Sequence, residues 1–177
     1  MSTNTTEQNT SHEIEEYFEK QLERTNSWLS FAEAKNVGLI AVNIALMAVI
    51  IEFFSDAPVF CVIAVAFAIA SSIVCLISFD PNMGKAVDKV RRKNKSKDLN
   101  LTFYGDIAQF DSTEQYINKT KELYFEKKDN VSRQAHDLAA EVLINSQITV
   151  RKYNWFKVAL RIDFAAMAFI MILFIAA

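Results

Sequence analysis

Long uncharged stretches dominate the pattern of hydrophobic and polar positions along the chain. The clearest is 59–79, which has 21 consecutive residues without a charge, twelve of them Leu, Ile, Val or Phe. As an α-helix rising about 1.5 Å per residue, it reaches roughly 31 Å, the thickness of the hydrocarbon core of a bilayer. The pattern therefore predicts a transmembrane helix over 59–79.

A second apolar stretch, 37–54, precedes it and is 18 residues long. It contains Asn43, and Glu52 lies near its far end, where a carboxylate reaches headgroups and water at low cost. Only Ser55-Asp56-Ala57-Pro58 separates the two stretches, and these residue types favour a turn. We therefore expect two transmembrane helices that form a hairpin.

A third candidate span, 156–177, closes the chain. Its last 14 residues are uncharged, and Arg161 and Asp163 precede them. Both charges are tolerated if they lie at the membrane interface, which Arg161 reaches by snorkelling. We expect a third transmembrane helix, and the alternative is a helix that lies flat on the membrane or packs on the hairpin.

Lysines and arginines indicate how these spans are oriented. Seven of them crowd between Lys85 and Lys97, and four more precede the uncharged part of the third candidate span, whereas the hairpin turn has none. Because cytoplasmic loops carry such an excess, we expect the N-terminus and residues 80–155 to face the cytoplasm. Residues 1–36 lack the apolar core of a cleavable signal peptide.

The N-terminal segment divides into two parts. Residues 2–11 are all Ser, Thr, Asn, Gln or Glu, which predicts a disordered polar tail over 1–10. Over 11–36 we expect an amphipathic cytoplasmic helix that begins with a capping box formed by Thr10 and Glu13. Its apolar face recurs at helical intervals, at Ile14, Phe18, Leu22, Thr25, Leu29 and Ala32.

Residues 80–155 are predicted to form a helical cytoplasmic region. No Gly or Pro occurs after Gly105, which is typical of helices. One helix begins either with Asp111 and Glu114 or with Ser112 and Gln115 as its capping pair. Asp129-Asn130 is the expected break, after which a helix of about 70 Å continues into the third span.

The fold class that follows is an all-α membrane protein, with an N-terminal helix, a transmembrane hairpin, a helical cytoplasmic segment and a long C-terminal helix. The composition agrees, because 51% of the residues are apolar and only three are Gly and two Pro. A formal net charge of −2 provides no basic field for nucleic acid. Membrane topology and anionic headgroups account for the basic run after the second span.

Side chains that perform catalysis or bind metals are scarce. His12 and His136 have no metal-ligand spacing with a cysteine or with each other. Cys61 and Cys75 are 14 residues apart on one predicted helix, roughly 21 Å, which is too far for a disulfide. No phosphate-binding loop or nucleophile elbow occurs either. We therefore expect no enzyme activity, no metal and no cofactor.

Three stretches carry a resemblance to a known family: Phe103-Tyr104-Gly105-Asp106-Ile107, the run 137–153 that leads into the C-terminal apolar helix, and the approach to the first span at 32–38. They resemble the transmembrane effectors of Pycsar, the pyrimidine-cyclase anti-phage system, and the similarity covers roughly residues 28–175. The approach at 32–38 departs from the family, in which Ala-Gly more often follows the lysine directly.

The resemblance implies a function and partners. In such effectors, a pyrimidine nucleotide cyclase makes cyclic CMP or cyclic UMP during infection, the effector senses it, and the inner membrane is then disrupted so that the infected cell dies. The implied partners are this ligand, the lipid bilayer and other copies of the chain in a homo-oligomer.

Candidate site residues also follow from the resemblance. A pyrimidine can stack on Tyr104, Gly105 permits close approach of the backbone, and Asp106 can accept a hydrogen bond from a ribose hydroxyl or an amine. The alternative is a simple turn before a helix, with Gly105 at positive φ and Asp106 as a cap. The candidates for phosphate binding are basic residues, Lys35, Arg151 and Lys152, although topology alone would also place them below the bilayer.

Within the membrane we single out two sets of residues. Ala64, Ala68, Ser72 and Cys75 give the second span a narrow face of small side chains suited to close helix packing. Asn43 and Glu52 line a wet path in the assembled state, or else cross-link neighbouring helices. Two other functional classes fit the pattern: a constitutive membrane scaffold or adaptor, and a small ion channel gated by another signal.

Overall fold

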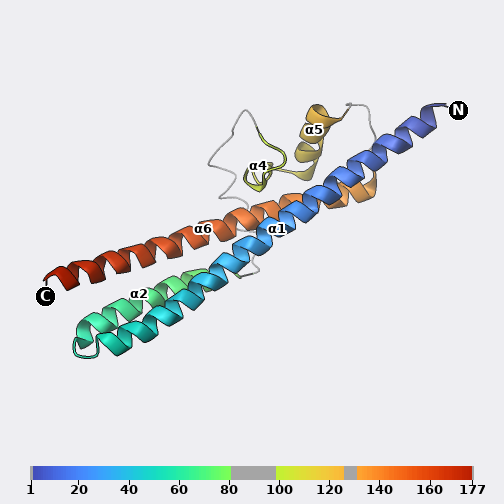
Figure 1. Ribbon diagram of the computed structural model, residues 1–177. Helices are drawn as coiled ribbons and strands as arrows, with labels where there is room; N and C mark the ends of the chain where they lie inside the picture. The colour runs from blue at the N-terminus through green and yellow to red at the C-terminus, as the bar shows by residue number, and fades with distance from the viewer. Residues whose placement is uncertain (1, 81–98, 126–130, 177) are drawn as a thin grey trace. The chain divides into compact units, whose positions relative to one another are not determined.

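The computed structural model describes residues 2–80, 99–125 and 131–176, and side chains within 12–80, 99–125 and 131–172. Every regular element in these ranges is a helix (Figure 1). The helices are α1 (Ser2–Phe53), α2 (Pro58–Ile77), α4 (Tyr104–Ile107), α5 (Thr113–Tyr124) and α6 (Arg133–Ala176). The all-α fold class is thus confirmed. Two features noted in the sequence, the basic run after α2 and the break at Asp129-Asn130, lie outside the described residues.

The chain divides into two compact units. The first unit contains Met1–Ser30 and Asn82–Arg151, and the second unit contains Phe31–Pro81 and Lys152–Ala177. Helices α1 and α6 each contribute residues to both units, whereas α4 and α5 belong to the first unit and α2 to the second.

Helix α1 begins earlier than the sequence predicts. It starts at Ser2, so the structure places residues 2–10 in the helix instead of a disordered tail, and Thr10 and Glu13 do not mark its beginning. The amphipathic helix and the first predicted span are also one continuous helix. The reason is that no Pro precedes Pro58, and adding a residue to an existing helix costs little compared with starting a new one.

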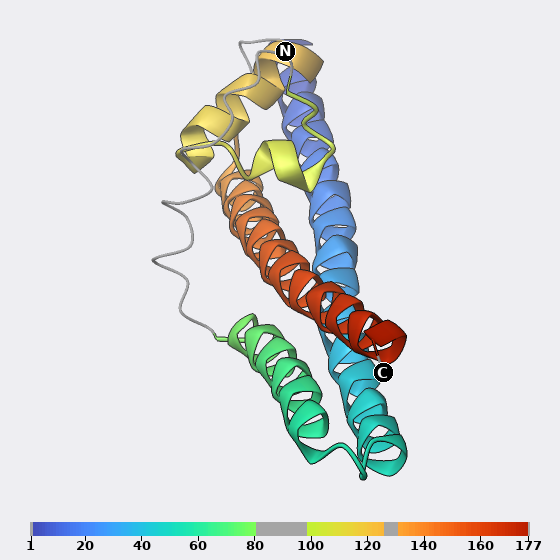
Figure 2. The same cartoon turned by 90° about the vertical axis from the view of Figure 1, so that its left-hand side faces the viewer.

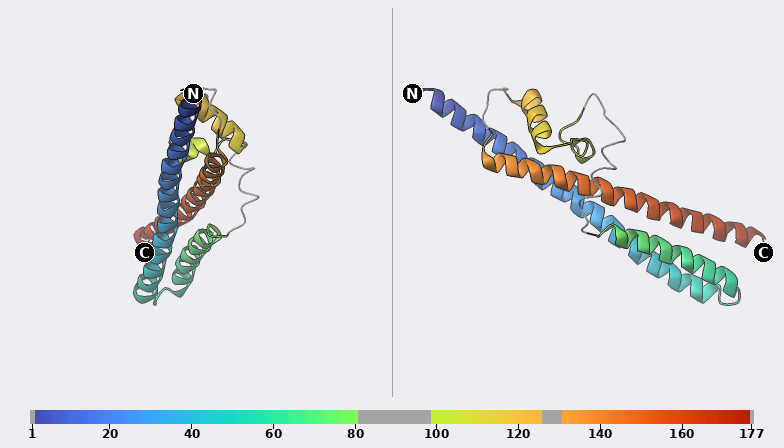
Figure 3. Two further views of the ribbon diagram at one scale, coloured as in Figure 1. Left: turned by 90° about the vertical axis from the view of Figure 1, so that its right-hand side faces the viewer. Right: turned by 180° about the vertical axis from the view of Figure 1, so that it is seen from behind.

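Large apolar side chains fill the core of the first unit. Ile14 and Phe18 lie one turn apart on α1 and are fully buried, as the amphipathic pattern predicts, and the Phe18 ring meets Tyr116 of α5 with centroids 5.6 Å apart. Figure 3 shows α4 and α5 beside the N-terminal parts of α1 and α6. The core comprises Ile14, Phe18, Leu101, Ile107, Tyr116, Ile117, Ala135, Ala139, Val142 and Leu143.

The start of α5 settles which capping pair the sequence uses. Ser112 has extended backbone angles, and its hydroxyl accepts a hydrogen bond from the backbone N–H of Gln115 at 3.3 Å. The Gln115 side chain in turn accepts from the backbone N–H of Asp111. Ser112 is therefore the N-cap, because its side chain satisfies one of the unpaired donors at the helix start.

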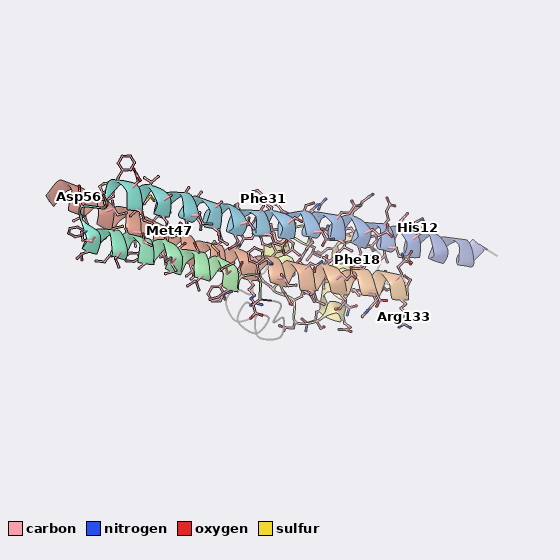
Figure 4. The ribbon with its side chains drawn as sticks, turned by 90° about the horizontal axis from the view of Figure 1, so that it is seen from below. His12, Phe18, Phe31, Met47, Asp56 and Arg133 are labelled. Atoms are coloured by element: carbon pink, nitrogen blue, oxygen red, sulfur yellow. The ribbon has the colours of Figure 1, made fainter. Side chains whose placement is uncertain are left out.

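In the second unit, α2 runs back along the C-terminal part of α1, as the predicted hairpin requires (Figure 2). Asp56 lies in the connecting turn, and Pro58 is at the first position of α2 (Figure 4). Contacts with α6 pair Ser71 with Ala159 and Phe67 with Phe169. Because α2 residue numbers fall as α6 numbers rise, the two helices are antiparallel.

Burial in the second unit is the reverse of that in a water-soluble domain. Large apolar side chains face outward: Phe53, Val59 and Val62 are 77%, 67% and 68% exposed. Helices α1 and α2 are long and apolar enough to cross a membrane. Helix α6 does not pass the same test within the described residues, since it carries Lys157, Arg161 and Asp163. A third span therefore stays a prediction.

Candidate functional site

Tyr104, Gly105 and Asp106 form most of the short helix α4 in the first unit. Gly105 does not have a positive φ, so that part of the turn alternative is wrong. A Cβ at this position would lie 2.6 Å from Cε1 of Phe103. A side chain at this position would displace the Phe103 ring, because that ring occupies the space that a Cβ would need.

The Asp106 carboxylate organises the backbone around α4. One oxygen accepts from the N–H of Asn100 at 2.9 Å, and the other accepts from the side-chain amide of Gln109 at 3.0 Å. Each carboxylate oxygen has two lone pairs, so Asp106 keeps capacity for a further donor. Its first role is structural, since it joins the backbone at Asn100, before α4, to the helix itself.

Three aromatic side chains gather at α4, and we call them the Trp28 cluster: Trp28, Phe103 and Tyr104. The Tyr104 ring centroid lies 5.3 Å from that of Trp28 and 4.6 Å from that of Phe103. Trp28 is 37% exposed and Phe103 40% exposed. Aromatic surface that stays open to solvent in this way can stack with a planar base.

Lys152 belongs to the second unit and is almost completely buried. Its ammonium group lies 3.1 Å from a Glu33 carboxylate oxygen, donates to the Ser78 carbonyl at 3.4 Å, and sits 4.6 Å from the centre of the Phe79 ring. A buried charge requires such partners. In this arrangement Lys152 ties α6 to α1 and to the end of α2.

Lys35 is held among aromatic rings of the same unit. Its ammonium nitrogen lies 4.5 Å from the ring centre of Phe31, 5.2 Å from that of Tyr153 and 5.8 Å from that of Phe156. These are cation–π distances. Arg151 is in the first unit with the Tyr104 element, whereas Lys35 and Lys152 are in the second unit.

The predicted membrane residues occupy different faces. Asn43 is fully buried, whereas Glu52, nine residues further along α1, is exposed. At about 100° per residue they point in opposite directions, and the structure does not bring them together. On α2, Ala64 and Ala68 are buried, but Ser72 is only half-buried and bonds its own helix at Ala68.

Ser71 is the buried serine of α2, and sequence reasoning missed it. Its hydroxyl lies 2.9 Å from a carboxylate oxygen of Asp163 and 3.2 Å from the carbonyl oxygen of Ala159. Asp163, which we expected at the membrane interface, is 8% exposed beside it. The signal was present, because small residues at 64, 68, 71 and 75 of α2, and at 78 just after it, are spaced alternately by four and three.

The histidines do not form a metal site in the part of the chain that the structure describes. His136 lies 3.5 Å from a Glu114 carboxylate oxygen on the surface of the first unit. The pKa of Glu114 is lowered by backbone hydrogen bonding at the helix start, by Ser112 and by His136. This arrangement is an exposed pair at the N-terminus of α5, where negative charge is favoured.

Comparison with known proteins assigns the family. The model of the PycTM family, the Pycsar effector protein domain, matches residues 17–177 and so includes both units. Neither the curated proteins nor the solved structures provide a match. Because the family model covers most of the chain, the resemblance seen in the sequence is confirmed. The chain belongs to the Pycsar effector family and is an effector of anti-phage defence.

Proposed function

We propose that this effector binds a cyclic pyrimidine mononucleotide, cyclic CMP or cyclic UMP, on its first unit and then permeabilises the inner membrane through its second unit. A partner cyclase makes the nucleotide during infection, and loss of the membrane barrier kills the infected cell. The observation that carries the proposal is the Trp28 cluster, a partly exposed aromatic surface next to a carboxylate. Membership of the Pycsar family supports the class of nucleotide.

The chemistry of the cluster suits a pyrimidine. A base stacks on Tyr104 or Phe103, and each stacked base contributes about 1–3 kcal/mol. Asp106 lies in the same helix and, beyond its two structural hydrogen bonds, accepts one from a ribose hydroxyl or an exocyclic amine. For the phosphate, Arg151 is the candidate in the same unit, since Lys35 and Lys152 serve packing in the second unit.

The second unit supplies the membrane action. In the proposed topology α1 and α2 cross the bilayer. Helix α6 crosses it as a third span, stabilised there by its antiparallel contacts with α2. The N-terminus and residues 80–155 then lie in the cytoplasm. Helices α1 and α6 run from one unit into the other, so a ligand that prefers one arrangement of the first unit shifts the population of span arrangements, in concert with other copies of the chain.

A binding experiment tests the first half of the proposal. Detergent-purified protein is titrated calorimetrically with cyclic CMP, cyclic UMP and, as a purine comparison, cyclic AMP. We expect one of the pyrimidine nucleotides to bind, and Tyr104→Ala to weaken binding by about 5- to 150-fold, the loss of one stacked base. Tyr124→Ala is the matched control, because Tyr124 is an exposed tyrosine of the same unit on α5. Binding of neither pyrimidine, or equal binding by Tyr104→Ala, contradicts the proposal.

A leakage experiment tests the second half. The protein is reconstituted in dye-loaded vesicles, and the nucleotide that binds is added on both sides of the membrane. Leakage only with nucleotide agrees with an effector. Leakage without any nucleotide indicates a channel gated by another signal, and no leakage in either condition indicates a scaffold or adaptor.

A further inference from the structure

Three helices contribute polar side chains to one cluster inside the apolar second unit. Asn43 of α1 and Ser71 of α2 are fully buried, and Asp163 of α6 is 8% exposed. The Asn43 amide lies near the Asp163 carboxyl, yet neither its nitrogen nor its oxygen has a hydrogen-bond partner of good geometry. A buried amide without partners is costly, so its position next to a carboxyl needs an explanation.

The number of protons available at Ser71 provides the first part of the explanation. The Ser71 oxygen lies between two acceptors, the Asp163 carboxyl oxygen at 2.9 Å and the Ala159 carbonyl oxygen at 3.2 Å. A hydroxyl has one proton and can donate to only one of them. If Asp163 carries a proton of its own, it donates to Ser71, and the Ser71 hydroxyl donates to Ala159. Both short distances are then hydrogen bonds.

The balance of charge provides the second part. In the described part of the chain, Asp163 forms no ion pair with a lysine, arginine or histidine, and Lys152, the buried lysine of the same unit, pairs with Glu33. The groups that face Asp163 are Ser71 and Cys75 from α2 and Asn43 from α1, and none of them is a cation. Ser71 lies six residues inside the end of α2, roughly 9 Å along a helix apolar enough to span. An ionised carboxylate without a cation is strongly disfavoured there.

We infer that Asp163, Ser71 and Asn43 form a proton-binding site within the spans, in which Asp163 is a neutral carboxylic acid that donates to Ser71. The ligand of the site is a proton, and each of the three helices contributes one side chain. In this state the site joins α6 to α2 without leaving a charge in lipid. Among the described carboxyl groups, Asp163 is the buried one.

The site also stabilises the open arrangement of the spans once water enters. This consequence rests on the proposed function. Water that reaches Asp163 solvates its ionised form, so the proton leaves to bulk water and the carboxylate stabilises the hydrated arrangement. Asp163→Asn cannot lose a proton, and it keeps a donor for Ser71. We expect it to insert normally and to reduce nucleotide-triggered leakage at least about tenfold, which corresponds to about 1.4 kcal/mol.

Infrared spectroscopy tests the site without any nucleotide. The full chain is reconstituted in ether-lipid vesicles, which lack ester carbonyl groups, and the carbonyl band of a protonated carboxylic acid is recorded at neutral pH. We expect the band in the native protein, its loss in Asp163→Asn, and its retention in Asp56→Asn, which removes an exposed carboxyl of the turn. Absence of the band in the native protein, or its persistence in Asp163→Asn, overturns the inference.

A second variant, Ser71→Ala, tests the site even if Asp163→Asn does not fold. Ser71→Ala removes the acceptor of the Asp163 proton, so we expect the acid band to remain and to shift in frequency. An unshifted band contradicts the hydrogen bond to Ser71. If the native band is present but no chain leaks with nucleotide, the proton site stands and the proposed function fails. If nucleotide triggers equal leakage in Asp163→Asn and native protein, the coupling of the site to opening is wrong.

Discussion

The two units of this protein bury opposite kinds of side chain. The first unit encloses large apolar residues such as Phe18 and Tyr116, and many of its charged groups face outward. The second unit encloses alanines and polar side chains such as Asn43 and Ser71, and it turns phenylalanine and valine outward. The first pattern is that expected in water, and the second is that expected in lipid, where close packing of small residues replaces the hydrophobic effect between helices.

The difference shows that one chain can contain a unit suited to water and a unit suited to lipid. Helix α1 alone contains both patterns, since its N-terminal half buries Ile14 and Phe18 while its C-terminal half exposes Val49 and Phe53. The same substitution should therefore have different effects in the two units. The predictions that follow test this contrast, beginning with the largest effect.

Phe18→Ala should produce the largest loss of stability. Phe18 is fully buried in the core of the first unit, and removing a buried phenylalanine costs about 3–5 kcal/mol. Phe164→Ala in the second unit should have little effect, because Phe164 is 57% exposed and, in the proposed topology, would face lipid both before and after unfolding within the membrane. Thermal unfolding in detergent, followed by circular dichroism, compares the two. Equal losses would show that the units do not differ in solvent.

Ala68→Leu should be the most damaging change in the face of α2 that packs inward. Ala68 is 5% exposed, and extra methylene groups at a closely packed position cost about 1–3 kcal/mol. Ala66→Leu is the matched control, since Ala66 is exposed on the same helix. We expect a lower melting temperature in detergent for Ala68→Leu alone. A loss of similar size in both variants would contradict the helix packing described for the second unit.

Two Gly→Ala changes should have opposite signs. At Gly105 the new methyl would meet the Phe103 ring, so we expect the first unit to lose about 1–3 kcal/mol as the ring is displaced. At Gly38 the methyl meets nothing within 4 Å in the middle of α1, so a gain of about 0.5–1 kcal/mol is expected from better helix propensity. Denaturant titration of the two variants measures both. A gain at Gly105 would remove the packing role assigned to it.

The smallest expected effect is an alkaline pH dependence that comes from the tyrosines of the first unit. Burial is the main cause that raises the pKa of Tyr17 to about 12, and the pKa of buried Tyr116 is raised as well. An unfolded tyrosine has a pKa of about 10, so between about pH 10 and 12 the unfolded state binds fewer protons than the folded state. The tyrosine contribution to stability is therefore constant below about pH 10 and falls above it. Tyr17→Phe should make this fall shallower in alkaline unfolding curves, and an unchanged slope would contradict it.

Local signals along the chain were sufficient to predict much of the fold. The hairpin follows from two apolar stretches and a short turn, and the buried face of α1 follows from the spacing of Ile14 and Phe18. The beginning of α1 was missed because a polar composition was taken as disorder, although no helix-breaking residue interrupts the segment. The capping alternatives at α5 differed by one residue, and only the Ser112 geometry distinguishes them.

The candidate sites were harder to predict because they depend on distant pairs. Glu33 and Lys152 form an ion pair, but more than one hundred residues separate them, so no local pattern shows it. The inward serine of α2 was placed at Ser72 instead of Ser71, since a stripe of small residues is ambiguous by one position. Asp163 is buried because it packs against Ser71 of α2. The sequence around Asp163 shows only a charged residue and gives no sign of this contact.

Each unit contains one of the chain's two tryptophans, so each has its own intrinsic fluorophore. Trp28 stands in the aromatic cluster of the first unit and Trp155 lies on α6 in the second. A Trp155→Phe variant would leave fluorescence that reports only on the Trp28 cluster, and Trp28→Phe would leave emission that reports only on the second unit. Binding and opening can thus be timed separately, without attaching a dye to the protein.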